Sequence, residues 1–254
     1  MCLALIALEA HPQLPLVIAA NRDEFHARAA VPAHWWDDGT LAGVDLEGGG
    51  TWLGVTRAGR WALVTNYREG APRDPKAPSR GMLVTRALAE RTPPLVCAAN
   101  IAADGRGYHG YNLLLGEVAS AAYTSNRASG AVALGAGIHG LSNHLLDTPW
   151  PKVVHAKQGL SRCLASEQID VESLFALLAD RRQAEPAALP TTGIAPEWER
   201  LLSSAFIVDA RYGTRCSTVL IQGRDGSARF VERSFDAQGR LTGEIAHQFA
   251  RGAA

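Results

Sequence analysis

The sequence has no excess of charge of either sign, because its 25 Lys and Arg residues balance 25 Asp and Glu residues. Without a basic or acidic field, the chain is not expected to bind nucleic acid or anionic lipid. Cysteine is also scarce: the 4 cysteines are scattered, with no C-x-x-C pair and no zinc-like spacing to histidine. These absences predict reduced thiols, no metal or other cofactor, and a small molecule as the partner.

Long apolar runs are missing as well. The first apolar stretch, residues 2–8, is far shorter than a membrane span and lacks the positive flank and cleavage site of a signal peptide. We therefore expect a cytoplasmic protein without a membrane span. With 254 residues, 27.0 kDa and no sharp shift in composition, the chain is expected to form a single domain over residues 1–254.

Apolar and β-branched runs predict strands near both ends of the chain. Residues 2–8 and 16–20 are expected to pair as an opening hairpin around a turn at 11–15, and residues 51–57 and 60–66 as a second hairpin in the same antiparallel system. Further strands are predicted at 111–115, 119–125, 205–210, 214–222 and 228–233.

Helical patterns cluster in the middle of the chain. Helices are predicted at 82–90, in a weaker stretch after it, from 151 toward Ala165, and at 171–180, with a capping residue and early prolines supplied by 147–151. The proline-rich segment 70–80 is expected to be an exposed loop that can serve as a lid. Blocks of strands separated by blocks of helices predict an α+β fold of antiparallel sheets covered by helices, not a doubly wound parallel sheet.

Several motifs are misleading. The stretches 105–110 and 135–140 match G-x-G-x-x-G, but no helix opens at the last glycine, so both are interpreted as turns and not as dinucleotide loops. The chain also lacks the G-x-S-x-G elbow of serine hydrolases. His139, His144 and Asp147 are not spaced as helical metal ligands, and we expect solvated or hydrogen-bonded histidines there. The same holds for His26 and His34 as ligands of haem iron.

The densest polar run in the N-terminal half, residues 21–24, follows directly on an apolar strand. If the opening hairpin turns near residues 12 and 13, Cys2 lies across from Arg22 or Asp23. We therefore expect this run to surround a site that contains Cys2. The alternative is a surface turn in which Arg22 pairs with an acidic neighbour.

Removal of Met1 would leave Cys2 with a thiol and a free α-amine on one residue. That amine has an ordinary pKa of about 7.7 to 8.0, so it can accept the thiol proton near neutral pH. An adjacent guanidinium such as Arg22 is expected to favour the thiolate. The alternative is that Cys2 is simply a small apolar residue in a buried strand.

Three other polar residues interrupt or end apolar strands: Asn66, Asn143 and Arg215. An asparagine amide can donate to a developing oxyanion, and an arginine can orient a nucleophile or bind a substrate carboxylate or phosphate. A turn-forming asparagine is the alternative at Asn66 and Asn143. Together the three residues would supply the donors that an acyl-transfer site needs.

With these residues in hand, the chain closely resembles the NRDE family, also called the transport and Golgi organisation protein 2 family. The segments that carry the resemblance are 1–3, the naming run 21–25, and 65–68, 111–114, 139–143, 147–152 and 212–217. The resemblance implies an N-terminal-nucleophile hydrolase fold, a four-layer αββα sandwich of two antiparallel sheets between helical layers.

A more distant resemblance is to bile salt hydrolases and penicillin V acylases. It implies a catalytic set that consists of Cys2, Arg22, Asp23, Asn66, Asn143 and Arg215. In those amidases the early Arg and Asp are separated by two residues, whereas here they are adjacent, so Asn21 or Glu24 can take one of the two roles. Asn21, Glu24, Tyr67 and His139 are assigned to substrate binding.

Two functions follow from these features. The first is an N-terminal cysteine hydrolase that cleaves a linear amide bond, or a related thioester or ester bond, of a small acylated substrate. The second, suggested by the family's links to haem mobilisation and to lipid or acyl-coenzyme A metabolism, is a non-enzymatic carrier that binds haem or an acyl chain. Trp35, Trp36, Trp52 and Trp61, near one another in sequence, fit either function. A purely structural partner-binding protein would leave the polar set without a use.

Overall fold

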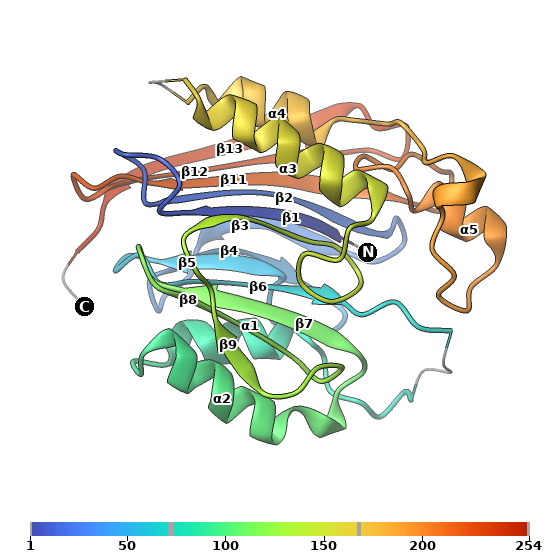
Figure 1. The fold of residues 1–254 in the computed structure, drawn as a ribbon. Coiled ribbons are helices and arrows are strands. Elements are labelled where there is room, and N and C mark those ends of the chain that lie inside the picture. The colour runs from blue at the N-terminus through green and yellow to red at the C-terminus, as the bar shows by residue number, and fades with distance from the viewer. Residues whose placement is uncertain (1, 71–73, 167–168, 253–254) are drawn as a thin grey trace.

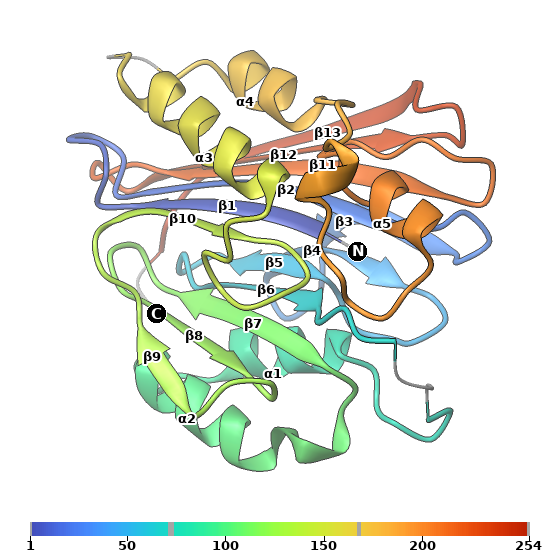
Figure 2. The ribbon, with the colours of Figure 1, turned by 45° about the vertical axis from the view of Figure 1, so that its right-hand side comes forward.

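Two antiparallel sheets face each other, and helices cover the outer face of each, so that the molecule has four layers (Figure 1). The computed structural model describes residues 2–70, 74–166 and 169–252. This arrangement is the predicted αββα sandwich. In both ribbon views, the start of the first strand lies at the same end of the sandwich as the short helix α5, Pro196–Leu201 (Figure 2).

The first sheet contains the first and the last strand of the chain. Its strands are β1 Cys2–Leu8, β2 Leu16–Phe25, β10 Gly137–Leu141, β11 Tyr212–Gln222, β12 Ser227–Phe235 and β13 Leu241–Ala250. They lie in the order β10-β1-β2-β11-β12-β13, and every neighbouring pair is antiparallel. The opening hairpin is therefore in the middle of the sheet, where both of its faces are covered.

The second sheet is built from one continuous stretch of sequence. Its strands are β3 Ala30–Trp35, β4 Thr40–Asp45, β5 Leu53–Thr56, β6 Trp61–Asn66, β7 Tyr111–Gly116, β8 Ala121–Ser125 and β9 Ala131–Ala133. They follow one another in chain order as an antiparallel meander. The predicted hairpin 51–66 forms, but the prediction that it joins the opening hairpin in one antiparallel system is wrong, because β5 and β6 belong to this other sheet.

The helices form the outer layers. They are α1 Gly81–Ala89, α2 Pro94–Asp104, α3 Pro151–Leu164 and α4 Val171–Leu178, with short 3-10 turns at Gly105–Gly107 and Pro186–Ala188. α3 and α4 pack on strands of the first sheet, while α1 and α2 pack on the second. As predicted, the segment 147–151 supplies the N-cap residue of α3, Trp150, and a proline at its start, Pro151, but Trp150 makes no side-chain capping hydrogen bond.

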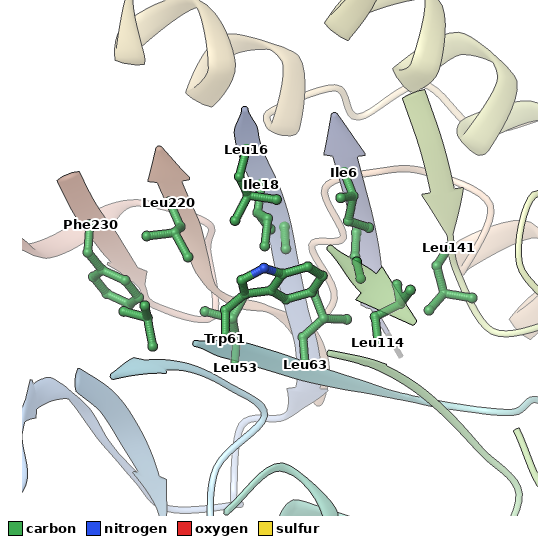
Figure 3. Packing of buried hydrophobic residues seen from close by; sticks show 14 of the residues in the cluster. Ile6, Leu16, Ile18, Leu53, Trp61, Leu63, Leu114, Leu141, Leu220 and Phe230 are labelled. Carbon is green, nitrogen blue, oxygen red and sulfur yellow. The ribbon is translucent and has the colours of Figure 1, made fainter. Parts of the chain in front are cut away.

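The main core lies between the two sheets. Side chains from both sheets meet there, with Ile6, Ile18 and Phe230 on one side and Trp61 and Leu63 on the other (Figure 3). Strand β1 alternates, so that its even-numbered residues enter this core while Leu3, Leu5 and Ala7 pack under the helices. The same alternation directs Cys2 into the space between the sheets, at the end of the core.

The predicted strand 205–210 is wrong. Within it, Val208 makes one isolated bridge to Gly213, and the carbonyl of Ala205 accepts a side-chain hydrogen bond from β2. The run is apolar because Phe206 and Ile207 are buried. Burial without a neighbouring strand edge does not make a strand, so the apolar pattern alone was misleading here.

Candidate active site

Cys2 begins β1 and lies directly opposite Arg22 of β2, as the hairpin register predicts. Its side chain is nearly buried, with 7% of the residue exposed. The backbone nitrogen of Cys2 donates to Oδ1 of Asn143 at 3.3 Å, and the backbone carbonyl accepts from Oγ of Ser142. The segment that follows β10 therefore holds the first residue of β1 by both of its main-chain polar groups.

A cavity of about 580 Å³ lies over Cys2. Its walls come from the end of β2, from β4 and β6 of the second sheet, and from the segment 74–81. The lining includes Cys2, Arg22, Asp23, Glu24, Arg28, Asp45, Asn66 and Arg80. Cys2 is thus placed at a polar cavity and is not sealed within the apolar interior. The described part of the proline-rich loop forms one wall, and its action as a lid stays a prediction.

Burial favours the protonated form of the Cys2 thiol. Burial raises the pKa of the thiol above its ordinary value, and this effect outweighs the nearby Arg22 guanidinium and a hydrogen bond from the Asp23 backbone, which both act to lower it. Arg22 therefore favours the thiolate, as expected, but burial has the larger effect. A base must remove the proton at the moment of attack.

Arg22 is oriented by Asp45, a residue that the sequence analysis missed. Nη2 of Arg22 lies 3.1 Å from Oδ2 of Asp45, and Nε of Arg28 donates to the same oxygen at 2.7 Å. Although burial alone would raise the pKa of Asp45, the hydrogen bond from Arg28 and the charge of Arg22 hold it below its ordinary value. The carboxylate is therefore charged and fixes two guanidinium groups at the cavity.

Asp23 points to the opposite face of the sheet from Arg22, toward the layer of α3 and α4. Its Oδ1 accepts a hydrogen bond from Oγ1 of Thr214 at 2.7 Å. Burial raises the pKa of Asp23, while the Lys152 ammonium acts to lower it. Lys152, also missed, comes from α3 and donates to the carbonyl of Leu202 at 2.9 Å, and burial lowers its pKa to about 8.

The two predicted asparagine donors have different placements. Asn66 ends β6 and lines the cavity above Cys2. Asn143 is fully buried, where Nδ2 donates to the carbonyl of Asn66 at 2.8 Å and Oδ1 accepts from the Cys2 nitrogen. Asn143 is therefore a link between Cys2 and Asn66, which corrects its expected use as an oxyanion donor.

Asn21 is a structural residue, which corrects its assignment to substrate binding. It is fully buried, and Nδ2 donates to the carbonyls of Leu178 and Ala205 at 2.9 and 2.8 Å. Its Oδ1 accepts from Oγ of Ser217. The side chain thus fastens β2 to the C-terminal end of α4 and to β11.

Arg215 and His139 are also placed away from the cavity over Cys2. Nη1 of Arg215 donates to three backbone carbonyls of the loop at 25–28, so its predicted role in orienting the nucleophile is wrong. His139 lies on β10, where Nδ1 bonds to Asp147 at 3.0 Å and Nε2 to the Gly135 carbonyl. Its assignment to substrate binding is likewise wrong.

A second cavity of about 320 Å³ adjoins the first. Glu24, Asn66, Arg80 and His109 line both cavities. Tyr67, predicted to bind substrate, lines only the second, where most of the other side chains are apolar or aromatic: Phe25, Ile194, Trp198, Leu202 and Tyr212. Of the residues predicted for substrate binding, Glu24 and Tyr67 are therefore the two that line cavities.

Within residues 2–70, 74–166 and 169–252, no group of three His, Cys, Asp or Glu side chains is arranged to hold a metal ion. His144 bonds through Nδ1 to Oγ1 of Thr148, and His26 bonds to the carbonyl of Asp209. Among the same residues, no helix is both long enough and apolar enough to cross a membrane.

Comparison with known proteins gives one family. The family model described as Transport and Golgi organisation 2 matches residues 1–237. The human Transport and Golgi organization protein 2 homolog is 35% identical over 238 residues, which cover 86% of each chain. Transport and Golgi organization protein 2 of Drosophila melanogaster is 30% identical over 268 residues and 92% of each chain.

Two of the solved structures with the same fold are named as an acylase and as an acid amidase. Penicillin V acylase from Agrobacterium tumefaciens superposes with a TM-score of 0.53 at 14% identity, over 92% of this chain and 83% of that one. The Caenorhabditis elegans ortholog of N-acylethanolamine-hydrolyzing acid amidase gives 0.52 at 14% identity, over 87% and 92%. At these identities the likeness establishes the fold alone, which is the predicted N-terminal-nucleophile hydrolase fold.

Proposed function

Because this chain belongs to the Transport and Golgi organisation 2 family and has the N-terminal-nucleophile hydrolase fold, we propose that it is an N-terminal cysteine hydrolase. Its substrate in this proposal is a small acylated molecule, cleaved at a linear amide bond or at a related thioester or ester bond. The observation that carries the proposal is the position of Cys2, at the start of β1 and on the wall of a polar cavity.

The proposed reaction begins once Met1 has been removed. The free α-amine of Cys2 then takes the thiol proton while the sulfur attacks the substrate carbonyl carbon. The resulting ammonium gives this proton to the leaving amine as the carbon–nitrogen bond breaks, which leaves a thioester on Cys2. Water, deprotonated by the same amine, hydrolyses the thioester and restores the thiol. This base is required because burial raises the pKa of the thiol.

The surrounding residues support this chemistry in distinct ways. Asn143 positions the Cys2 nitrogen through its Oδ1, and it fixes Asn66 through the Asn66 carbonyl. Asn66, which lines both cavities, is the proposed donor to the oxyanion that forms on the carbonyl carbon. Arg22, held by Asp45, is proposed to orient the substrate at the cavity wall.

The test begins with the intact mass of the purified protein, which establishes whether Met1 has been removed. Turnover is then measured on a panel of fluorogenic N-acyl amides and matched thioesters. We expect Cys2→Ala to abolish turnover, while Cys97→Ala, at a buried cysteine beneath the second sheet, keeps it. Retained Met1, or full activity of Cys2→Ala, would reject the mechanism.

The same variants distinguish the carrier function from the hydrolase function. The second cavity, of about 320 Å³, gives the carrier function specific support because its aromatic and aliphatic side chains can contact a hydrophobic ligand. Absorbance titration with haem and fluorescence titration with a fatty acyl probe measure binding without turnover. Tight binding that survives Cys2→Ala, together with no hydrolysis of any substrate in the panel, would favour a carrier over an enzyme.

A further inference from the structure

The second cavity has a wall of three aromatic rings in mutual contact. The centroids of Phe25 and Tyr212 are 5.0 Å apart in an edge-on arrangement, and those of Trp198 and Tyr212 are 5.8 Å apart. Phe25 also approaches Trp198, at 6.3 Å. We call this group the aromatic wall. Its members come from β2, β11 and α5, three elements that meet at the end of the sandwich where β1 begins (Figure 2).

One ring of the aromatic wall remains open. Phe25 is 43% exposed although it is a large apolar side chain in contact with two other rings. Tyr212, in contrast, is buried, and its hydroxyl donates to the Asp23 carbonyl at 2.7 Å. The inner part of the wall is therefore fixed by a hydrogen bond, and the outer part presents an apolar surface to the cavity. Covering such a surface with an apolar group lowers the free energy of the system.

Strand β2 connects the position opposite Cys2 to the aromatic wall within a few residues. Arg22 pairs with Cys2, Glu24 lines both cavities, and Phe25 ends the strand. On the opposite side, Asn66 borders both cavities as well. A molecule whose carbonyl lies at the Cys2 sulfur can therefore extend past Glu24 and Asn66 into the second cavity.

Two charged groups at the second cavity, Arg68 and Glu69, are paired with protein partners. Arg68 is bound to Glu199 at 2.5 Å and lies over the Trp150 ring, and Glu69 is bound to Arg127 at 2.6 Å. These charges therefore need no charged ligand to compensate them. Glu24, Asn66, Arg80 and His109 make the part shared with the first cavity polar, whereas the aromatic wall, Ile194 and Leu202 offer aromatic and aliphatic carbon to a ligand.

We infer that the second cavity is a binding site for an apolar acyl or aryl group attached near the carbonyl that Cys2 attacks. This inference rests on the proposed function and specifies its substrate class: N-acyl compounds with an apolar group of moderate size. Phe25 and Trp198 are the residues that select this group, because the Phe25 ring is exposed and Trp198 is half-buried, whereas Tyr212 is buried.

The first test uses thiol alkylation, which requires no turnover. Cys2 of the full chain is treated with iodoacetamide or with N-benzyl iodoacetamide, and labelling is followed by peptide mass mapping. Cys163, half-buried and on α3, corrects for the intrinsic reactivity of the two reagents. We expect Cys2 to prefer the benzyl reagent by about three- to tenfold, the range typical of one added aromatic contact.

Variants locate the source of this preference. Phe25→Ala and Trp198→Ala are each expected to remove most of it, while Leu241→Ala, at an exposed residue of β13, leaves it unchanged. Circular dichroism confirms that each variant is folded. An equal preference in wild type and in Phe25→Ala and Trp198→Ala, or no preference in wild type, would overturn the inference.

The outcomes separate this inference from the proposed function. A benzyl preference that depends on Phe25, in a protein that turns over nothing, keeps the apolar site and rejects the hydrolase. Turnover that depends on Cys2 but is equally fast for acetyl and phenylacetyl amides keeps the hydrolase and rejects the apolar site. When both hold, Phe25→Ala should raise KM for the phenylacetyl amide and leave the acetyl amide unaffected.

Discussion

The side chain of Lys152 is the most unusual charge near the candidate site. Only 6% of the residue is exposed, and its Nζ is held by the carbonyls of Leu202 and Ser204 at 2.9 and 3.5 Å. Burial lowers its pKa to about 8, while the negative charge of Asp23 acts to raise it. At neutral pH the ammonium is therefore mostly charged, and it provides the positive charge that acts on the buried Asp23.

This burial makes the free energy of unfolding depend on pH. In the folded protein Lys152 loses its proton near pH 8, whereas in the unfolded chain it does so near the ordinary value of 10.5. Between these values the unfolded state binds more protons, so the contribution of Lys152 to stability rises with pH, by about 3 kcal/mol over the whole interval. We expect Lys152→Met to lose this rise.

The effect is measured by urea denaturation of wild type and Lys152→Met at several pH values between 7.5 and about 10. The difference in unfolding free energy between the two proteins should shift steadily in favour of wild type as pH increases. Lys157→Met, which alters a half-exposed lysine on the same helix, is the control and should not show the shift. Parallel pH curves for wild type and Lys152→Met would contradict the assignment.

At this scale, sequence reasoning succeeded where local geometry decides the outcome. The contact between Cys2 and Arg22 follows from one hairpin with a short turn, so counting along the chain was sufficient. Asp45 and Lys152 reach the same region from β4 and α3. Their placement depends on how a second sheet and a helix pack against the hairpin, and neither residue type nor spacing reports that packing.

The connection between β10 and α3 depends on Asp147. Its Oδ1 accepts hydrogen bonds from the Gly140 nitrogen at 2.8 Å and from Lys157 at 2.6 Å, and its Oδ2 bonds to His139 at 3.0 Å. Its backbone is left-handed, with φ of 57°. Burial alone would raise the pKa of Asp147, but the hydrogen bonds from His139, Lys157 and Gly140 lower it to about 2.

Asp147→Asn tests this connection without straining the backbone, because asparagine also tolerates a positive φ. The hydrogen bond to Asp147 raises the pKa of His139. The stabilisation from the two charges is therefore fully present below pH 6.5, where the histidine of the unfolded chain is also charged. It is lost as pH rises through the pKa of His139 in the folded protein. It also weakens as pH falls from 3.8 through about 2, where Asp147 takes up a proton.

We therefore expect the loss of stability in Asp147→Asn to be largest near pH 5, about 1 kcal/mol after allowance for solvent screening of a side chain about one third exposed. Urea denaturation between pH 3 and 8 measures the difference from wild type. A difference that is constant over that range would show that Asp147 acts through its shape and not through its charge.

Strand prediction failed most at the edges of the sheets. The interior strand β4 and the four edge strands β3, β9, β10 and β13 were not predicted, and of these β3 and β13 are largely exposed. β13 contains Glu244, His247 and Gln248, so it has neither an apolar run nor a clear alternation. These strands form because an already paired neighbour offers them backbone hydrogen bonds, and this tertiary effect leaves little trace in residue type.

At the scale of the whole molecule, the order of strand and helix blocks correctly predicted antiparallel sheets covered by helices, and the family resemblance correctly implied that two such sheets form a sandwich. The same patterns could not assign the hairpin β5–β6 to the second sheet. Alternation shows that one face of a strand is buried. Because the two sheets bury their inner faces against each other, the alternation is the same whichever of the two sheets contains the strand. The inter-sheet core, to which β1 and β6 both contribute, is the feature that joins the two sheets.

This shared core should make the sheets unfold together. Leu63 of β6 is fully buried between Leu53 and Leu114, and it faces the core side of the first sheet (Figure 3). We expect Leu63→Ala to lower the free energy of unfolding by about 2–5 kcal/mol. Leu241→Ala, at an exposed leucine of β13, should stay within about 0.5 kcal/mol of wild type.

Buried cysteines on the two sides of this core report whether unfolding is cooperative. Cys216 lies in the first sheet and Cys97 lies beneath the second, on α2, and both are buried. Pulse labelling of Leu63→Ala with a thiol reagent along a urea gradient should expose both at one concentration, because loss of the shared core removes the support of both sheets. Exposure of Cys216 at clearly lower urea than Cys97 would mean that the first sheet, which carries Cys2, separates and unfolds independently.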